Sequence, residues 1–394
     1  MPGQFRYLAP HLAQRGHDVI FMTQRKDREL PGVRKLVYAP RRQPGEAGHR
    51  YLRGLEDAIL HGQETLRACQ ALRQAGYVPD VIVGHPGWGE TLFVKAVYDK
   101  VPVVAYGEFY FRPENLLSWF DPDEAHHPDD ICRTRISNSH ILMAMENADL
   151  GWSPTQWQAA TFPDLFQPRI RTVFDGIDTA VVRPDPAARL TLPDGQVVTA
   201  DDEIITYAAR NLELMRGFPS FMRALPEILA ARPKAQVVIT GGDLVSYDSA
   251  ITKQTLWREK MLAEVELPPG RVHFLGYIPY DQYLSLLQVS AAHIYLTYPF
   301  VLSWSFFEAM AAGCLMVASD TAPVRELVRH GDNGLMTDFW DHGRIAQDVL
   351  AALEDPRRQA LRQAARATVV ERYGMEACLA GQRGILAEAT GRAW

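Results

Sequence analysis

Two arginines stand where a strand-like segment meets a helix-like segment in YAARNLELMRGF. Arg210 ends an apolar run typical of a buried strand, and Arg216 precedes Gly217 and a helix-like segment. Guanidinium groups near a helix start, where backbone N–H groups lack partners, are well suited to bind a diphosphate. Arg210 alone would be interpreted as a surface residue. The pair beside a glycine makes an anion site as good an interpretation as two surface side chains.

One carboxylate, Glu308, lies in the apolar segment YPFVLSWSFFEAMAAG. We expect a strand to leave the core here and a helix to follow, capped by Ser303 or Ser305. Glu308 then falls in the first turns of this helix, where it can accept hydrogen bonds from two vicinal hydroxyls, such as those of a ribose. The alternative is compensation of the helix dipole, a contribution of ~0.3–1 kcal/mol.

Weaker signals follow two other strand-like runs. Gly241 and Gly242 end VVITGG, where glycines let a ligand or a neighbouring backbone approach closely, although a plain turn explains them too. His85 ends DVIVGH, and a lone histidine at a strand end is more often structural than functional. Glu90 and Glu108 are expected at the same side of that sheet, with no role beyond contacts to an acceptor.

Strand-like and helix-like segments alternate almost throughout the chain, which predicts an α/β protein with parallel sheets covered on both faces. A Gly-, Asp- and Pro-rich connector near residues 171–190 separates two such series. We therefore expect two doubly wound, Rossmann-like domains facing a cleft, with ligands at the carboxyl ends of the strands. The predicted strands are 17–23, 33–40, 80–85, 101–109, 203–210, 235–242, 271–276, 292–297 and 314–320. The predicted helices are 51–75, one from about Gly89, 218–233, 256–265, 280–290, 305–313, 322–331 and those after about residue 341.

The N-terminal segment MPGQFRYLAPHLAQRGHDV predicts a turn at Gly3 and a helix that ends at Gly16. A doubly wound domain ordinarily begins with a strand that feeds such a turn, and no strand precedes this one. We expect either that the natural gene product is longer, with roughly 8–12 further residues rich in Val, Ile and Phe, or that the domain lacks its usual central strand.

The formal net charge of −6 over 394 residues argues against a general nucleic-acid-binding surface. The exception is Arg25–Arg53, where nine basic and three acidic residues give +6. A solvated surface is the favoured interpretation, and a site for an anionic acceptor or lipid headgroups is the alternative. We accordingly expect a cytoplasmic protein. The alternative is a cytoplasmic protein that contacts the inner face of the membrane peripherally through Arg25–Arg53.

Four scattered cysteines without a CxxC pair favour a reducing compartment over disulfides or a zinc site. No signal peptide is visible in the sequence. The longest weakly charged run, His293–Ser319, is interrupted by Pro299 and Gly313 and is better explained as strand, helix and strand than as a membrane span. The Asp-x-Asp of DPDEAHHPDD lies in an acidic, loop-like stretch, so we expect no metal site there.

Several segments together resemble the retaining, nucleotide-sugar glycosyltransferases of GT-B fold, the family 4-like and group 1 glycosyltransferases. In chain order these are VFDGIDTAVVRP, RNLELMRG, VHFLGYIPYDQYLSLLQVSAAHIYLTYP, FEAMAAGCLMVASDTAPVREL and GDNGLM. No one segment is specific, but the ordered set is, and it covers essentially the whole chain. Asp175 replaces the Asn of the family's linker, and Arg216 replaces the Lys of its diphosphate-binding pair.

The resemblance implies transfer of a sugar from a nucleotide-diphosphate donor to a glycan, lipid-linked or small-molecule acceptor. It implies retention of the anomeric configuration and no cofactor or metal, because arginines and helix dipoles neutralise the leaving diphosphate. It implies domains at 1–174 and 175–374, with a final helix at 375–394 crossing back to the first. The implied catalytic residues are His85, Arg210, Arg216 and Glu308. The implied donor-binding residues are Gly3, Gly241, Gly242, Tyr277, Phe300, Leu302, Ser303, Trp304 and Glu308.

One position departs from the family's pattern. Phe300 stands where the family has the first Glu of its E-x7-E motif, which approaches the donor sugar. Only Glu308 matches as the ribose ligand, so the donor sugar is open and a deoxy or less polar sugar is one expectation. Two alternatives also stay open. A nucleotide-sugar epimerase of the same fold would need further acid–base carboxylates, and a non-catalytic nucleotide-sugar- or glycan-binding protein would release no nucleotide from a donor.

Overall fold

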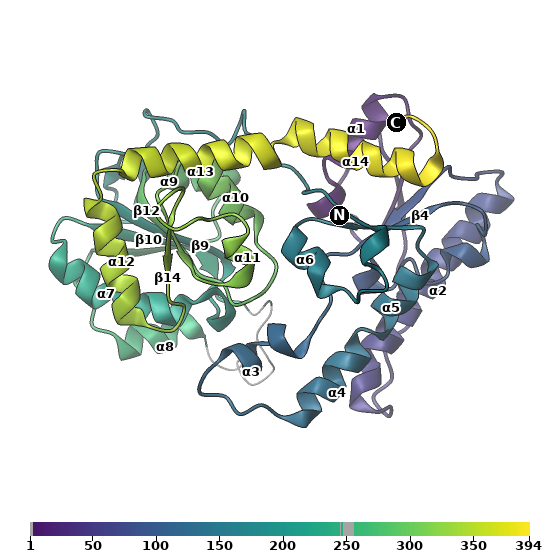
Figure 1. Cartoon of the computed structure of the whole chain (residues 1–394), viewed down its shortest axis with the longest axis horizontal. Coiled ribbons are helices and arrows are strands. Elements are labelled where there is room, and N and C mark those ends of the chain that lie inside the picture. Colours follow the sequence, from purple (N-terminus) through teal and green to yellow (C-terminus); the bar gives the residue numbers. More distant parts are fainter. Residues whose placement is uncertain (1–2, 245, 247–255) are drawn as a thin grey trace. The chain divides into compact units, whose positions relative to one another are not determined.

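The computed structural model describes residues 3–244, 246 and 256–394. The chain separates into two compact units, which are described one at a time (Figure 1). Unit 1 comprises residues 1–176 and 375–394, and unit 2 comprises residues 177–374.

Unit 2 is built on a sheet of six parallel strands in the order β11-β10-β9-β12-β13-β14. Its four inner strands, β10, β9, β12 and β13, are apolar and buried almost from end to end, as expected where helices cover both faces of a sheet. A short antiparallel hairpin of β7 (Leu190–Thr191) and β8 (Val197–Val198) precedes them. The strands are β9 (Ile204–Asn211), β10 (Gln236–Gly242), β11 (Val272–Gly276), β12 (Ser290–Tyr295), β13 (Met316–Ser319) and β14 (Leu335–Thr337).

Helices lie on both sides of this sheet, with α7, α8 and α12 on one side and α9, α10 and α13 on the other (Figure 1). The predicted alternation of strands and helices in this unit is confirmed. The helices are α7 (Phe218–Ala231), α8 (Trp257–Glu264), α9 (Tyr280–Gln288), α10 (Trp304–Ala311), α11 (Ala322–Arg325), α12 (His342–Glu354) and α13 (Arg358–Tyr373).

Unit 1 holds two separate parallel sheets among its described residues. β1 (Ile20–Thr23) pairs with β2 (Arg34–Val37), and β3 (Ile82–Gly84) begins a second sheet in the order β3-β4-β5-β6. The remaining strands are β4 (Val103–Tyr106), β5 (Leu150–Ser153) and β6 (Ile170–Thr172). The helices are α1 (Leu8–Gln14), α2 (Arg53–Gln74), α3 (Leu117–Phe120), α4 (Pro128–Ser137), α5 (Ser139–Asn147), α6 (Gln156–Thr161) and α14 (Met375–Thr390).

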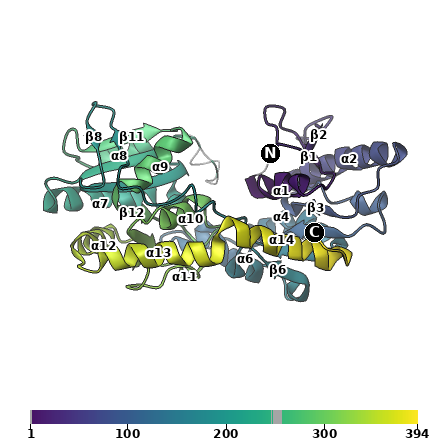
Figure 2. The same ribbon diagram turned by 90° about the horizontal axis from the view of Figure 1, so that it is seen from above.

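α14 packs against α1 and against strands β4 and β5 (Figure 2). Ile385 and Leu386 of α14 share a core cluster with Phe5 and Leu8 near the chain's start. The two ends of the chain therefore complete the same hydrophobic core.

The helix predicted from about Gly89 is wrong. The chain instead forms two short 3-10 turns, η3 (Pro86–Trp88) and η4 (Val94–Ala96). Gly89 has a φ of 89°, and a Cβ there would lie 2.1 Å from the Ala58 carbonyl oxygen. The chain thus presses against α2 in a left-handed turn, which a continuous helix does not accommodate.

Candidate active site

The strand order of unit 2 reverses between β9 and β12. The chain passes from β9 outward to β10 and β11, and then returns to place β12 on the other side of β9. Connections that leave neighbouring strands in opposite directions diverge at the carboxyl ends of those strands, where ligands of doubly wound sheets bind. The end of β9 carries Arg210, and the segments after β9 and β12 carry Arg216 and Glu308, so three predicted site residues come from this switch point.

Arg216 ends the 3-10 turn η7 (Leu214–Arg216) and is buried, with 8% of its surface exposed. Its Nη1 donates hydrogen bonds to Thr297 Oγ1 at 2.8 Å and to the Val301 carbonyl at 3.3 Å, with Tyr295 Oη at 3.4 Å. Gly217 follows with a φ of 65°, and a Cβ there would lie 2.4 Å from Leu296 Cβ. The glycine therefore lets the Arg216 turn pack against the loop that follows β12.

Arg210 differs from Arg216 in its surroundings. It is the next-to-last residue of β9, and its side chain is exposed. One guanidinium is therefore fixed at the switch point, while the other extends into solvent at the same strand end. The structure places both near one edge of the sheet, which is the arrangement that the sequence predicted.

Glu308 is the fifth residue of α10 and is 6% exposed. Tyr280, at the start of α9, donates a hydrogen bond from its hydroxyl to Glu308 Oε1 at 2.8 Å. Burial and the negative charge of Glu308 raise the pKa of Tyr283 well above its ordinary value. Because the helix-dipole effect falls off within the first turn, dipole compensation is a weak explanation for a carboxylate in the second turn.

Ser303 is the N-cap residue of α10, but the predicted capping by its side chain is wrong. No backbone N–H of α10 donates a hydrogen bond to the Ser303 side chain. Its hydroxyl lies 2.7 Å from the Ser305 hydroxyl, and both its hydroxyl and its backbone N–H donate to Tyr295 Oη. The Tyr295 hydroxyl thus connects the start of α10 to Arg216.

Phe300 lies in the loop between β12 and α10. Its ring stacks on Tyr298 with centroids 5.4 Å apart, and the Arg216 guanidinium lies 6.0 Å from its ring centroid. A cation over an aromatic face is attracted by the ring quadrupole. Leu302 is buried and Trp304 is half-buried as the first residue of α10. The side chain of Leu302 is therefore part of the packing, and only its backbone is suited to contact a donor.

The glycines at the end of β10 make room for protein groups. A Cβ on Gly242 would lie 2.3 Å from the Tyr277 ring, and one on Gly241, whose φ is 151°, would lie 2.7 Å from the Ala209 carbonyl oxygen. Tyr277 donates a hydrogen bond to Asn211 Oδ1 at 2.6 Å, and its side chain is otherwise largely exposed. The expected close approach is made here by Tyr277 and the β9 backbone.

Unit 1 has its own polar cluster at the carboxyl ends of β3 and β4. His85 Nδ1 accepts a hydrogen bond from the Gly87 N–H at 2.9 Å, and His85 Nε2 lies 3.2 Å from Glu108 Oε2. Because Nδ1 is an acceptor, Nε2 carries the proton and donates to Glu108. Gln4, in the 3-10 turn η1 (Gly3–Phe5), donates to the other Glu108 oxygen at 2.8 Å. The turn that begins at Gly3 is therefore linked to His85 through hydrogen bonds that both make to the Glu108 carboxylate.

A second polar group in unit 1 surrounds Glu90. Tyr38 donates to Glu90 Oε1 at 2.7 Å, and the Tyr38 hydroxyl is 3.4 Å from His61 Nδ1. Burial and, next, the Glu90 charge raise the pKa of Tyr38 above its ordinary value, so the phenol stays protonated and acts as the donor. Glu90, which follows β3 in the chain, is thus hydrogen-bonded by Tyr38, which follows β2.

The basic segment Arg25–Arg53 is largely neutralised in the structure. Seven of its nine basic side chains form ion pairs. Four of the partners lie outside the segment and did not enter its charge count: Asp18, Glu56, Glu64 and Asp129. The local excess of positive charge is therefore much smaller than the segment's own composition indicates. Among the residues described, no helix is long and apolar enough to cross a membrane.

No group of three or more His, Cys, Asp or Glu side chains in the described part of the chain is arranged to hold a metal ion. Metal independence itself stays a prediction. Three residues of the site were missed by sequence reasoning: Tyr280, Tyr295 and Thr297. Their positions beside strand ends were visible, but a tyrosine or threonine there has no distinctive spacing.

Two family models together match most of the chain. The Glycosyl transferase family 4 group matches residues 15–182, and Glycosyl transferases group 1 matches residues 194–368. The chain belongs to the glycosyltransferases that these two family models describe. The predicted fold is confirmed by solved GT-B glycosyltransferases that this transferase resembles. Sucrose-phosphate synthase of Thermosynechococcus elongatus has a TM-score of 0.74 at 18% identity, covering 98% of this chain and 92% of the other.

Curated relatives of the transferase are also glycosyltransferases by name. It is 26% identical to a D-inositol 3-phosphate glycosyltransferase of Acidothermus cellulolyticus, over 89% of this chain and 76% of the relative. It is 26% identical to a GDP-mannose-dependent alpha-(1-6)-phosphatidylinositol monomannoside mannosyltransferase of Mycobacterium tuberculosis, over 57% of each chain. Among solved structures, Anabaena HepE in complex with UDP-glucose has a TM-score of 0.68 at 15% identity, over 98% of this chain and 95% of the other.

Proposed function

We propose that this glycosyltransferase moves a sugar from a nucleoside-diphosphate donor to a hydroxyl of an acceptor, with retention at the anomeric carbon. The observation that carries the proposal is the arginine pair at the switch point of unit 2. Arg216 is held by Thr297 and Val301 across the β9–β12 boundary, and Arg210 projects from the same strand end. Fixed positive charge at the carboxyl ends of parallel strands suits a diphosphate.

The proposed chemistry is mainly electrostatic. The acceptor oxygen bonds to the anomeric carbon as the bond from that carbon to the phosphate oxygen breaks, and the acceptor proton passes to the departing phosphate. Arg210, Arg216 and the N-terminal end of α10 stabilise the negative charge that develops on the diphosphate. Attack and departure on the same face of the sugar would preserve the anomeric configuration.

Glu308 and His85 are proposed to orient the donor. Glu308, positioned by Tyr280, would accept hydrogen bonds from the ribose hydroxyls. His85, whose ring is fixed by Gly87 and Glu108, would contact the donor sugar. Tyr277, the backbone at Gly241 and Gly242, and the segment from Phe300 to Trp304 complete the proposed donor-binding residues, together with Gly3 near the diphosphate.

The acceptor is proposed to be a hydroxyl of a glycan, a lipid-linked sugar or a small molecule. The transfer is proposed to need no metal ion and no cofactor. The relatives named for inositol 3-phosphate and for phosphatidylinositol mannosides make phosphorylated polyols the first acceptors to test. The protein is proposed to act in the cytoplasm. Because most of the Arg25–Arg53 charge is paired, membrane contact through that segment is the less favoured form of this proposal.

The test is a panel of UDP-, GDP- and ADP-linked glucose and mannose, screened by thermal shift and then by release of the nucleoside diphosphate. We expect at least one donor to stabilise the protein, slow release without acceptor, and faster release with an inositol phosphate or a sugar alcohol. NMR of the product should show the donor's anomeric configuration. A donor that stabilises the protein but releases no nucleotide with any acceptor would contradict transfer and favour a binding role.

A further inference from the structure

Trp88, which follows β3 in unit 1, is the most exposed tryptophan of the chain. All eight tryptophans lie in the described residues, and seven of them are buried or half-buried, whereas 61% of the Trp88 surface is exposed. An indole left in water forgoes the free energy that burial of so large an apolar group would give. Single exposed apolar side chains are common at protein surfaces, so a role for Trp88 has to be argued from its surroundings.

The turn that carries Trp88 is held by contacts on both sides. Trp88 ends η3, between Gly87 and Gly89, and neither glycine position has room for a side chain. A Cβ on Gly87 would lie 2.7 Å from the His85 ring, while Gly89, with its φ of 89°, packs against the backbone of α2. His140 of α5 donates from Nε2 to the Gly87 carbonyl at 3.0 Å. The exposed indole is therefore presented by a turn that α2 and α5 fix in place.

The imidazole of His85 connects Trp88 to the core of the unit and to Glu108. The His85 ring centroid lies 6.0 Å from that of Trp88 and 5.7 Å from that of Tyr106, which is almost fully buried. Both ring nitrogens of His85 are engaged, Nδ1 by the Gly87 N–H and Nε2 by Glu108. Trp88 thus stands beside a carboxylate that the same imidazole holds in place.

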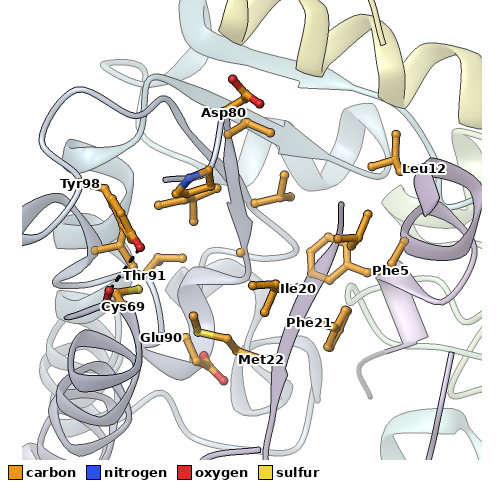
Figure 3. Close-up of a pocket in the computed structure, with 18 of the residues that line it drawn as sticks. Phe5, Leu12, Ile20, Phe21, Met22, Cys69, Asp80, Glu90, Thr91 and Tyr98 are labelled. Atoms are coloured by element: carbon orange, nitrogen blue, oxygen red, sulfur yellow. Dashed lines mark hydrogen bonds between the residues drawn. The ribbon is translucent and has the colours of Figure 1, made fainter. Parts of the chain in front are cut away.

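Two carboxylates near Trp88 are suited to accept hydrogen bonds from hydroxyl groups. The Glu108 side chain is 29% exposed, and a carboxylate has about four lone-pair sites, so the bonds from Gln4 and His85 do not saturate it. Glu90 follows Trp88 by two residues and lies with it in the wall of a cavity of about 500 Å³ (Figure 3). Glu90 Oε2 is buried without a hydrogen-bond partner among the described residues, and such an atom calls for a donor.

We propose that a neutral pyranose or cyclitol ring of the acceptor stacks on Trp88, with Glu108 accepting hydrogen bonds from the hydroxyls of that ring. This inference rests on the proposed glycosyl transfer and names the chemistry of the acceptor. A sugar ring presents C–H groups on its face and hydroxyls at its rim, so it matches an exposed aromatic face beside carboxylates. The two carboxylates disfavour a phosphate at this position because like charges repel. A phosphate on the acceptor would therefore be bound elsewhere.

The first test measures ring binding without a donor, by saturation-transfer NMR on the full chain. The ring probes are myo-inositol and methyl α-D-glucopyranoside, and sorbitol is the open-chain control. We expect Trp88→Ala to weaken binding of the ring probes by roughly tenfold, and Trp88→Phe to keep most of it. Glu108→Gln should also weaken binding, because the hydroxyls lose a charged acceptor. Leu165→Ala, which truncates another exposed apolar side chain of unit 1, should bind like the wild type.

Three results of this test would overturn the proposal. Equal binding of the ring probes to the wild type and to Trp88→Ala would remove the stacking contact. A loss with Trp88→Ala but none with Glu108→Gln would indicate an apolar ligand without hydroxyl contacts. Tighter binding of choline than of either ring probe, lost in both variants, would assign the site to a cation held over the indole face.

The second test measures transfer with the donor and acceptor that the panel above identifies. The KM for the acceptor should rise by roughly tenfold in Trp88→Ala, while the KM for the donor stays the same and Trp88→Phe restores most of the loss. A rise in the KM for the donor instead would place the donor sugar on Trp88 and overturn the acceptor assignment. If no donor supports transfer, the proposed function fails, whereas the NMR result still supports or overturns ring binding at Trp88.

Discussion

Glu308 is fixed by a tyrosine that its own segment does not contain. Tyr280 lies 28 residues earlier, at the start of α9, and its hydroxyl donates to the Glu308 carboxylate. The sequence could place Glu308 near a helix start, because an apolar run interrupted by Pro299 and Ser303 has few other interpretations. It could not supply the partner, since that contact depends on how α9 and α10 pack on the sheet.

Replacing Glu308 by Gln should leave the fold intact, because the amide oxygen can still accept from Tyr280. Donor affinity should fall by roughly tenfold or more, since hydrogen bonds to a charged group contribute about 1.5–3 kcal/mol. A 2′-deoxy donor should lose less than the ribose donor. Calorimetry measures both affinities, circular dichroism checks the fold, and Glu264→Gln, at an exposed ion pair, is the matched control. Equal losses for the two donors would remove the ribose assignment.

Phe300 is a second residue whose surroundings change its interpretation. Phe300→Glu has two conceivable outcomes: a shift toward fully hydroxylated sugars, or crowding that lowers activity with every donor. The ring lies beside the Arg216 guanidinium, so a carboxylate there would pair with the charge proposed to hold the diphosphate. We therefore expect kcat/KM to fall for deoxy and hydroxylated donors alike, with Phe300→Leu as the uncharged control. Unchanged values for both donors would show that residue 300 lies outside the site.

At the scale of elements, the order of strands and helices in unit 2 was predictable and the spatial order of its strands was not. Apolar runs bounded by Gly, Pro and Asp mark each strand, and helical periodicity marks each helix. The Arg216–Thr297 hydrogen bond joins residues 81 positions apart, and it exists because β12 returns to lie beside β9. Likewise, the helix predicted near Gly89 does not form because the chain there contacts Ala58, and the local sequence does not show this contact.

The pairing of β9 with β12 carries a further consequence at His293. Its Nδ1 lies 2.8 Å from Thr206 Oγ1, its Nε2 is buried without a hydrogen-bond partner among the described groups, and burial lowers its pKa to about 3. The folded state thus resists protonation that the unfolded chain accepts near pH 6.5. The contribution of the neutral histidine to the free energy of unfolding is complete above that pH. It is lost as the pH falls toward 3, by about 1.4 kcal/mol per pH unit.

The corresponding variant is His293→Asn, which keeps a polar atom near the position of Nδ1. It should be less stable at neutral pH because volume is lost from the core. Its free energy of unfolding should nevertheless fall less steeply as the pH is lowered. Between roughly pH 6 and pH 4 the slope should be smaller by the contribution of about one proton, ~1.4 kcal/mol per pH unit. Urea unfolding across that range measures the slope. The same slope in the wild type and the variant would mean that another group controls the acid sensitivity.

For the whole molecule, the sequence predicted an α/β protein of two doubly wound parts, and the structure and its GT-B neighbours confirm that fold. Composition misled in one respect. The charge of Arg25–Arg53 was counted within the segment, whereas Asp18, Glu56, Glu64 and Asp129 come from other parts of the chain to pair with it. Long-range ion pairs of this kind follow from the fold and leave no local pattern.

The proposed diphosphate site can be separated from general stability because its two arginines differ in burial. Arg216→Ala should weaken nucleoside-diphosphate binding and also lower the unfolding temperature, because Thr297 and the Val301 carbonyl lose a buried donor. Arg210→Ala should weaken binding without changing the unfolding temperature, since its side chain is exposed. Arg223→Ala, at an exposed ion pair of α7, should change neither. Differential scanning fluorimetry gives the unfolding temperatures.

Calorimetric titration of Arg210→Ala with a nucleoside diphosphate and with the matching nucleoside tests whether the arginine pair binds a diphosphate. The UDP–uridine, GDP–guanosine and ADP–adenosine pairs are each titrated into the wild type, and the tightest pair is carried to the variant. We expect a loss of roughly tenfold or more in diphosphate affinity, the range for a charge-assisted hydrogen bond, with the nucleoside affinity unchanged. Equal losses for both ligands, or no loss for either, would contradict it.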